Sequence, residues 1–207
     1  PAFKDKRYMK VNGKLIFGVF SPLDIPDFDL FKSIWNKLAK ENGLEGFYFF
    51  GLCTGIDSGK LVVDKGYDVA CIDYMQKQNM INNPISAIFW KNVRKFTTIP
   101  KIMTYDRYVK DMLTHFVAKE RYIPSIGPNF DHSPRSRNRG VILLGSTPKK
   151  WNKLCKAIFD KVKFRSHEEN IVIIRSWNEW GEGNYLEPDL KYGKQYIEMT
   201  RNAIENV

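Results

Sequence analysis

Two glutamates three residues apart, Glu179 and Glu182, have the types and spacing best suited to chemistry on a sugar. A pair of carboxylates can cleave a glycosidic bond, because one protonates the leaving oxygen while the other acts as base or nucleophile. Residues three apart in an extended strand point to opposite faces, so the chain must turn for both to meet one substrate. Gly181 and Gly183 permit such a turn, since glycine tolerates a positive φ angle.

The residues around the two glutamates fit the same chemistry. Trp177 and Trp180 offer apolar ring faces to a pyranose, and the amide of Asn178 can bond a hydroxyl group. The competing interpretation is a tryptophan- and glycine-rich loop whose glutamates are solvated or paired with Arg175. The residue types alone leave these two interpretations equally open.

The position of this segment favours the catalytic interpretation. The apolar run 171–174 predicts a buried strand, and the segment 175–183 follows it directly. In barrels and open parallel sheets, the carboxyl ends of the strands carry the chemistry. We therefore expect the two glutamates at the functional edge of a sheet.

Apolar runs alternate with amphipathic stretches along the chain, whereas residues 76–104 give few clear signals. This alternation predicts a parallel sheet with crossover helices. We expect Asp189 to cap the closing helix. Strands are expected at 15–20, 46–50, 67–72, 122–126 and 170–176, and helices at 27–41, 105–118, 148–164 and 190–203.

The fold class is α/β, with two architectures open. Four or five strands are visible in 207 residues, whereas a complete eight-stranded barrel usually needs about 250 residues. The chain is either a small open sheet or the C-terminal portion of a (β/α)8 TIM-barrel type fold whose N-terminal strands lie upstream. Pro1 is not a natural start, which favours the second architecture.

Composition sets further limits. The net charge is +10, but the lysines between Lys149 and Lys163 alternate with apolar residues at helical spacing, which indicates a solvated helix face rather than a nucleic-acid site. No apolar run reaches the roughly 18 residues of a transmembrane helix. Cys53, Cys71 and Cys155 lack metal-type spacing, so we expect no metal and a reducing, cytoplasmic compartment.

Three further residues are candidates for substrate binding. Asp131 and Arg135 lie in a loop after the expected strand at 122–126, so they can reach the same edge and bind sugar hydroxyls or an acidic substituent. The competing interpretation is an Asp–Arg pair that holds the loop. Tyr185 follows the glutamate segment and is expected to line the cleft.

Residues 177–189, followed by Tyr192-Gly193, resemble the WbsX-type polysaccharide-biosynthesis proteins, which contain a domain similar to glycoside hydrolase family 99. Upstream segments also resemble short sequence motifs of that family. They are Asn12-Gly13-Lys14, Tyr67-Asp68-Val69-Ala70 and the loop from Pro128 to Arg135. The resemblance covers nearly all 207 residues but only the C-terminal part of the family domain.

The resemblance implies one domain over residues 1–207, part of a (β/α)8 barrel, acting without a cofactor on an oligo- or polysaccharide. It implies a place in bacterial surface-polysaccharide (O-antigen, lipopolysaccharide) biosynthesis or processing. Family 99 hydrolases cleave α-mannosidic linkages with retention. By position, Glu179 would assist the 2-hydroxyl of the sugar in its attack on the anomeric carbon, and Glu182 would act as acid and then base.

Departures from the family pattern bear on the substrate. Phe130, His132 and Gly181 stand where the family carries Trp, Asn and a bulkier residue, often His. A glycosyltransferase rather than a hydrolase, and a non-catalytic glycan-binding module of the same fold, remain open as alternatives. We also expect a partner or an upstream segment to complete the barrel.

Overall fold

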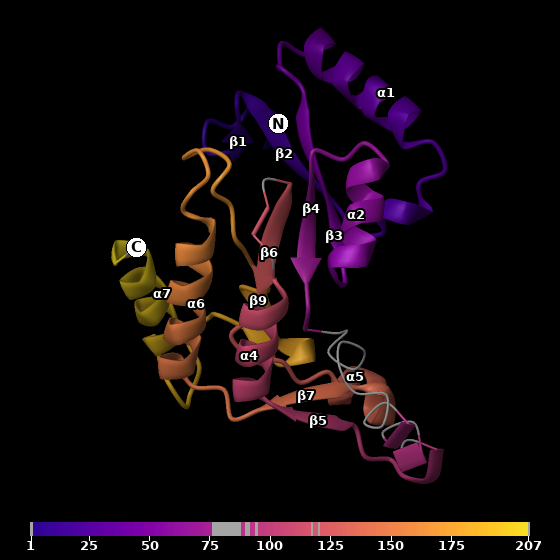
Figure 1. Ribbon diagram of the computed structural model, residues 1–207. Coiled ribbons are helices and arrows are strands. Elements are labelled where there is room, and N and C mark those ends of the chain that lie inside the picture. Colours follow the sequence, from indigo (N-terminus) through magenta and orange to yellow (C-terminus); the bar gives the residue numbers. More distant parts are fainter. Residues whose placement is uncertain are drawn as a thin grey trace.

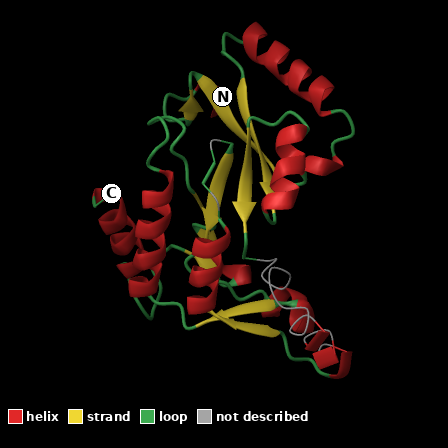
Figure 2. Ribbon diagram, in the orientation of Figure 1, coloured by secondary structure: helices red, strands yellow, loops and turns green. Residues whose placement is uncertain are grey.

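The computed structural model describes residues 2–75, 88–89, 92–93, 95–116, 118–119 and 121–206. This part of the chain is mixed α/β and is organised around a curled half-barrel sheet (Figures 1 and 2). β1 is antiparallel to β2, and every other neighbouring pair in the main sheet is parallel. In spatial order, the sheet contains β1 (Lys10–Val11), β2 (Lys14–Val19), β3 (Phe47–Cys53), β4 (Val69–Asp73), β6 (Tyr122–Ile126) and β8 (Ile173–Ile174).

The parallel sheet expected from the apolar runs is confirmed. Its parallel strands follow one another in chain order, β2-β3-β4-β6-β8, as they do in a barrel. Among the described residues the sheet has five parallel strands, not the eight of a closed barrel. The last strand is shorter than expected, because only Ile173 and Ile174 pair with β6.

Helices form where the amphipathic stretches predicted them, with side-chain caps at three of the N-termini, including Thr104, whose hydroxyl accepts from the Arg107 N–H. The Asp27 carboxylate accepts a hydrogen bond from the Leu30 N–H, and the Thr147 hydroxyl accepts one from the Lys150 N–H. α2 and α5 were not predicted. The helices are α1 (Phe28–Glu41), α2 (Ile56–Asp64), α4 (Tyr105–His115), α5 (Ser133–Ser136), α6 (Pro148–Val162) and α7 (Gln195–Glu205).

The main hydrophobic core lies between the helices and one face of the sheet. Phe28 of α1 stacks on Tyr67 with ring centroids 3.6 Å apart and meets Phe49 of β3 edge-on. A smaller cluster on the other, inner face of the sheet includes Val69 and Ile123. The helices therefore cover one face of the sheet, and the inner face has its own apolar cluster.

Two strands outside the main sheet support a loop. β5 (Lys101–Thr104) pairs in parallel with β7 (Val141–Leu144) as a separate two-stranded sheet, below the main sheet in Figure 1. Neither strand was predicted. An isolated antiparallel bridge joins Asp131 to Ile142 of β7. The loop at 127–140 therefore follows β6 directly and is joined to this small sheet by the bridge at Asp131.

The expectation that Asp189 caps a helix at 190–203 is wrong. α7 begins at Gln195, and its N-cap is Lys194. The Asp189 carboxylate instead accepts hydrogen bonds from the backbone N–H groups of Lys191 and Tyr192. An aspartate caps a local turn as readily as a helix, so its type alone did not determine where the helix begins.

Over the described part of the chain, no helix combines the length and apolar character that a bilayer crossing requires, and no group of three or more potential ligands could hold a metal ion. Cys53, Cys71 and Cys155 are buried thiols without a disulfide. Burial raises the pKa of the Cys71 thiol well above its usual value, which disfavours the nucleophilic thiolate.

Buried tyrosines predict loss of stability at high pH. Burial raises the pKa of both Tyr67 and Tyr74 from 10 to about 12, and each hydroxyl donates to a backbone carbonyl. The stabilisation is complete below about pH 10, where unfolded tyrosine ionises, and is lost as the pH rises toward 12. Absorbance at 295 nm should show these tyrosines ionising late. In Tyr67→Phe, unfolding stability should fall less steeply between pH 10 and 12; an unchanged slope would contradict the prediction.

Candidate active site

The glutamate segment folds back on itself at the carboxyl end of the sheet. After β8, the chain forms β9 (Asn178–Glu179), a 3-10 turn at Trp180–Glu182 and β10 (Asn184–Tyr185), which pairs antiparallel with β9. Gly183 takes a φ of 50°, and a Cβ there would lie 2.9 Å from the Cβ of Asp131. The turn expected between the two glutamates is therefore present.

Glu182 is buried, with 10% of its side chain exposed, and both of its carboxylate oxygens contact cationic side chains. Its Oε1 accepts a hydrogen bond from Arg135 Nη1 at 2.9 Å and lies 3.4 Å from His132 Nε2. Its Oε2 lies 3.4 Å from Arg175 Nη2. The interpretation that a glutamate pairs with Arg175 thus holds for Glu182.

Arg175 connects Glu182 to a third charge. Its Nη1 lies 2.5 Å from Oδ2 of Asp73, the last residue of β4, and its backbone N–H donates to the Ile126 carbonyl at the end of β6. The charge network Asp73–Arg175–Glu182 therefore joins the carboxyl ends of three neighbouring strands. Sequence reasoning did not propose Asp73 for the site, although the signal was available: opposite charges directly after two buried strands.

Glu179 has a different environment from Glu182. Its side chain is exposed at the end of β9, and it makes no hydrogen bond or ion pair with any residue that the structure describes. Its Oε1 lies 3.2 Å from where a Cβ on Gly181 would be, so a larger residue there would crowd it. One glutamate of the pair is anchored, and the other is free to meet a solute.

An aromatic surface adjoins the glutamates. Trp180 stacks on Tyr185 with ring centroids 3.8 Å apart and an angle of 15° between the planes, and its Nε1 donates to Glu187 Oε2 at 2.7 Å. We call this pair of rings, Trp180 and Tyr185, the aromatic platform. About half of each of Trp180 and Trp177 is exposed. The platform is rigid and still accessible, as a surface for a sugar ring must be.

The loop candidates separate into two roles. The Asp131 carboxylate accepts from the N–H and the hydroxyl of Ser133, and its own N–H donates to the Glu182 carbonyl at 2.7 Å. Arg135 contacts Glu182, and no ion pair joins Asp131 to Arg135 among the described residues. Asn178 is exposed, and its backbone pairs with Tyr185. The structure brings Asp131 and Arg135 to Glu182, whereas Asn178 stays on the exposed side.

Two tyrosines hold the backbone beneath the site. The hydroxyl of Tyr105 donates to the Gly127 carbonyl at 2.8 Å, and the Gly127 N–H donates to the Tyr108 hydroxyl at 3.0 Å. A Cβ at Gly127 would approach Met75 Sδ to 2.1 Å and the Arg175 carbonyl to 2.9 Å. Only glycine therefore lets the end of β6 pass so close to Arg175.

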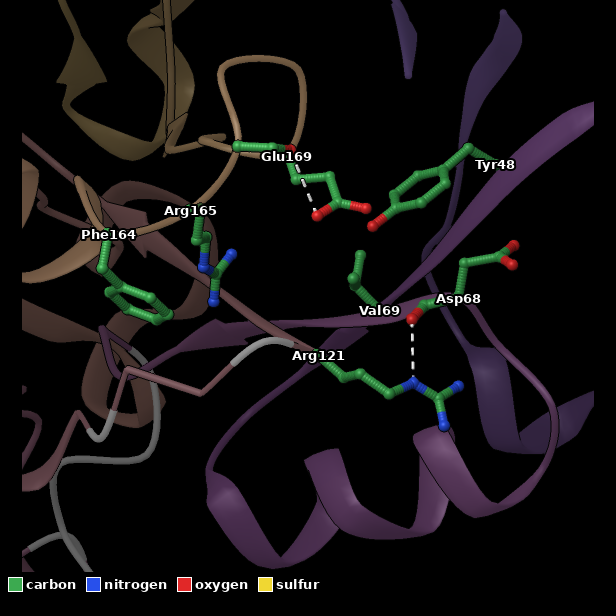
Figure 3. A pocket seen from close by; sticks show the side chains of 8 residues that line it. Tyr48, Asp68, Val69, Arg121, Phe164, Arg165 and Glu169 are labelled. Atoms are coloured by element: carbon green, nitrogen blue, oxygen red, sulfur yellow. Dashed lines mark hydrogen bonds between the residues drawn. The ribbon is translucent and has the colours of Figure 1, made fainter. Parts of the chain in front are cut away.

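A hollow of about 480 Å³ lies at the other end of the sheet, by residues that precede the strands (Figure 3). Arg121 Nε donates to the Asp68 carbonyl at 3.1 Å, and Arg165 donates to the carbonyls of Lys119 and Tyr122. These guanidinium groups connect the segments that lead into the strands. Residues at the amino ends of barrel strands typically serve stability, and this arrangement fits that role.

Comparisons with known proteins agree with the fold. A solved structure described as a glycoside hydrolase-like protein is 18% identical, with a TM-score of 0.57 over 96% of this chain and 56% of that chain. The GH99 endo-alpha-mannosidase from Bacteroides thetaiotaomicron is 17% identical, with a TM-score of 0.47 over 98% of this chain and 56% of that one. The first likeness supports a glycoside-hydrolase type of fold.

Among curated proteins, an uncharacterized protein WxcX from each of two strains of Xanthomonas campestris pv. campestris is 22% identical over 202 residues. The match covers 97% of this chain but only 28% of the length of those relatives. The family described as "Glycosyltransferase WbsX" matches residues 1–200, nearly the whole chain. The chain therefore belongs to the WbsX family.

Proposed function

We propose that this protein is a carbohydrate-active enzyme that acts on mannoside-like glycosidic bonds in the biosynthesis or processing of bacterial surface polysaccharide. Membership of the WbsX family supports the pathway, and the fold likeness to a glycoside hydrolase-like protein supports the class of bond. The observation that carries the proposal is the pair Glu179 and Glu182, placed at the carboxyl end of a parallel sheet beside the aromatic platform.

The proposed chemistry gives the two carboxylates different tasks. Glu179 accepts the proton of the sugar 2-hydroxyl while that oxygen attacks the anomeric carbon, and Glu182 protonates the departing glycosidic oxygen. The attack closes a strained three-membered ring between the 2-oxygen, C1 and C2 of the sugar. An incoming hydroxyl then attacks the anomeric carbon, opens this ring and loses its proton to Glu182, and the 2-oxygen recovers its proton from Glu179. Water as the incoming hydroxyl gives hydrolysis, and a second sugar gives transfer.

The two glutamates have different surroundings in the site. Exposed Glu179 can reach a hydroxyl group of a bound sugar, whereas buried Glu182 is held in one place by Arg135 and Arg175. The aromatic platform offers a ring face on the same segment.

The direct test uses α1,2-, α1,3- and α1,6-linked mannobioses with a fluorescent label at the reducing end. Release of labelled mannose supports hydrolysis, and lengthening of the labelled chain supports transfer. If every mannobiose remains intact while saturation-transfer NMR shows that one of them binds, the protein is a glycan-binding module. Neither turnover nor binding with any of the three would overturn the proposal for mannosides.

The aromatic platform predicts a loss of binding. Replacing Trp180 by alanine removes one stacked ring, and aromatic contacts contribute roughly 0.5–1.5 kcal/mol beyond the buried area. We expect the mannobiose Kd to rise about tenfold, measured by titration NMR. Phe164→Ala is the matched control, because Phe164 is as exposed as Trp180 but lies at the opposite end of the sheet. Equal effects of the two substitutions would contradict the role of the platform.

A further inference from the structure

We infer that Asp73 and Arg175 are positioning residues that hold the Glu182 carboxylate in place for the reaction. This inference rests on the proposed function, because Glu182 needs a fixed place only if it acts on a substrate. Asp73 does not belong to the glutamate segment and lies more than a hundred positions away from Arg175 in the sequence.

Asp73 is the fixed end of the charge network. It is 2% exposed at the end of β4, and both of its oxygens have partners. Oδ1 accepts from the Met75 N–H at 2.7 Å, and Oδ2 contacts Arg175 Nη1 at 2.5 Å. A buried carboxylate with both oxygens bonded has little freedom to move, so it can fix the orientation of a guanidinium group.

Arg175 transmits that orientation. Its two terminal nitrogens point to two different carboxylates, Asp73 and Glu182, in the fixed directions that the planar guanidinium fork gives its N–H groups. Its backbone is fixed by the hydrogen bond to Ile126, and the Phe130 ring lies 5.8 Å from its guanidinium carbon. Backbone and side chain are both held, so the position of Glu182 Oε2 follows from that of Asp73.

The two sides of Glu182 differ in a way that suits catalysis. The Arg175 side chain is 19% exposed, whereas that of Arg135 is 65% exposed. Oε2 therefore contacts the more buried arginine, and Oε1 contacts the more exposed one. Stability alone does not call for this arrangement, because a buried ion pair is often no more stabilising than apolar residues of similar volume.

A measurement without substrate tests the connection. The side-chain carboxyl carbon of glutamate is labelled with ¹³C and observed by NMR. The signal of Glu182 is assigned as the one that is absent from the spectrum of Glu182→Gln. Asp73→Asn should shift that signal although Asp73 does not touch Glu182. In an Arg175→Lys background, Asp73→Asn should no longer shift it. An unmoved signal in the single variant, or an undiminished shift in the double variant, would overturn the inference.

Kinetics test the consequence. With a labelled mannobiose, Asp73→Asn and Arg175→Lys should each lower kcat about a hundredfold with KM nearly unchanged, since small misplacement of a catalytic group has effects of this order. Arg139→Lys, an exposed loop arginine, is the control. Thermal unfolding shows whether each variant is folded.

These experiments distinguish a failure of the proposed function from a failure of the positioning inference. If Glu182→Gln retains full turnover, the proposed function is wrong. If Glu182→Gln is inactive while folded Asp73→Asn and Arg175→Lys keep the wild-type kcat, the function stands and the positioning inference falls.

Discussion

Replacing Glu182 by glutamine is expected to lower the turnover of a labelled α-mannobiose by about 10²–10⁴-fold, the usual contribution of a general acid or base. Glutamine keeps the size and shape of glutamate but cannot give up and recover a proton in the same way. If the substitution removes an interaction made only in the transition state, kcat and kcat/KM should fall together. Steady-state kinetics with each mannobiose measures both constants.

The control for this substitution is Glu198→Gln, at an exposed position of α7, outside the glutamate segment. Its turnover should match that of the unaltered protein. Because Glu182 also contacts Arg135 and Arg175, the variant must be shown to be folded by circular dichroism. A folded Glu182→Gln protein with unchanged kcat would remove Glu182 from the mechanism.

The largest effect on stability is expected from Trp151→Ala. Trp151 on α6 is fully buried, and its Nε1 donates to the Thr200 hydroxyl of α7 at 2.8 Å. Removing such a side chain costs roughly 3–5 kcal/mol of unfolding free energy. For a chain of this size, each kcal/mol lowers Tm by about 2–4 °C, so the loss should be about 10 °C. Thermal unfolding followed by circular dichroism measures it.

Two milder variants separate packing from hydrogen bonding in that result. Trp151→Phe keeps most of the ring and loses the hydrogen bond, so it should cost about 1 kcal/mol for the bond, plus a smaller packing loss than alanine causes. Trp177→Ala removes a half-exposed tryptophan and should leave Tm almost unchanged. If Trp151→Ala and Trp177→Ala have the same Tm, α7 does not depend on Trp151 for its attachment to α6.

The strands and helices with regular apolar patterns could be predicted, and the others could not. β2 and α1 have the continuous and amphipathic apolar patterns that burial on one side produces. β5 has only four residues, and its Lys101 is buried, so its sequence does not read as a core strand. α2 contains Gly59, which weakens its helix propensity but fits closely against Ile72.

The candidate site was predicted in part for similar reasons. The glutamates, the tryptophans and the turn between them are adjacent in the sequence, so local residue types were enough to locate them. The contacts of Glu182 with Arg135, Arg175 and His132 depend on how the loop at 127–140 packs against β10 and the 3-10 turn. Such pairing is decided by tertiary structure and cannot be read from spacing along the chain.

The small β5–β7 sheet has a consequence for how substrate preference can change. It holds the far end of the loop that carries His132 and Arg135, and it is separate from the strands that carry Asp73 and Arg175. Substitutions in β5, for example at Ile102 opposite Ile142, could shift Arg135 while the sheet beneath Glu182 stays as it is. Under the proposed function, directed evolution toward a different sugar therefore has a target outside the glutamate pair itself.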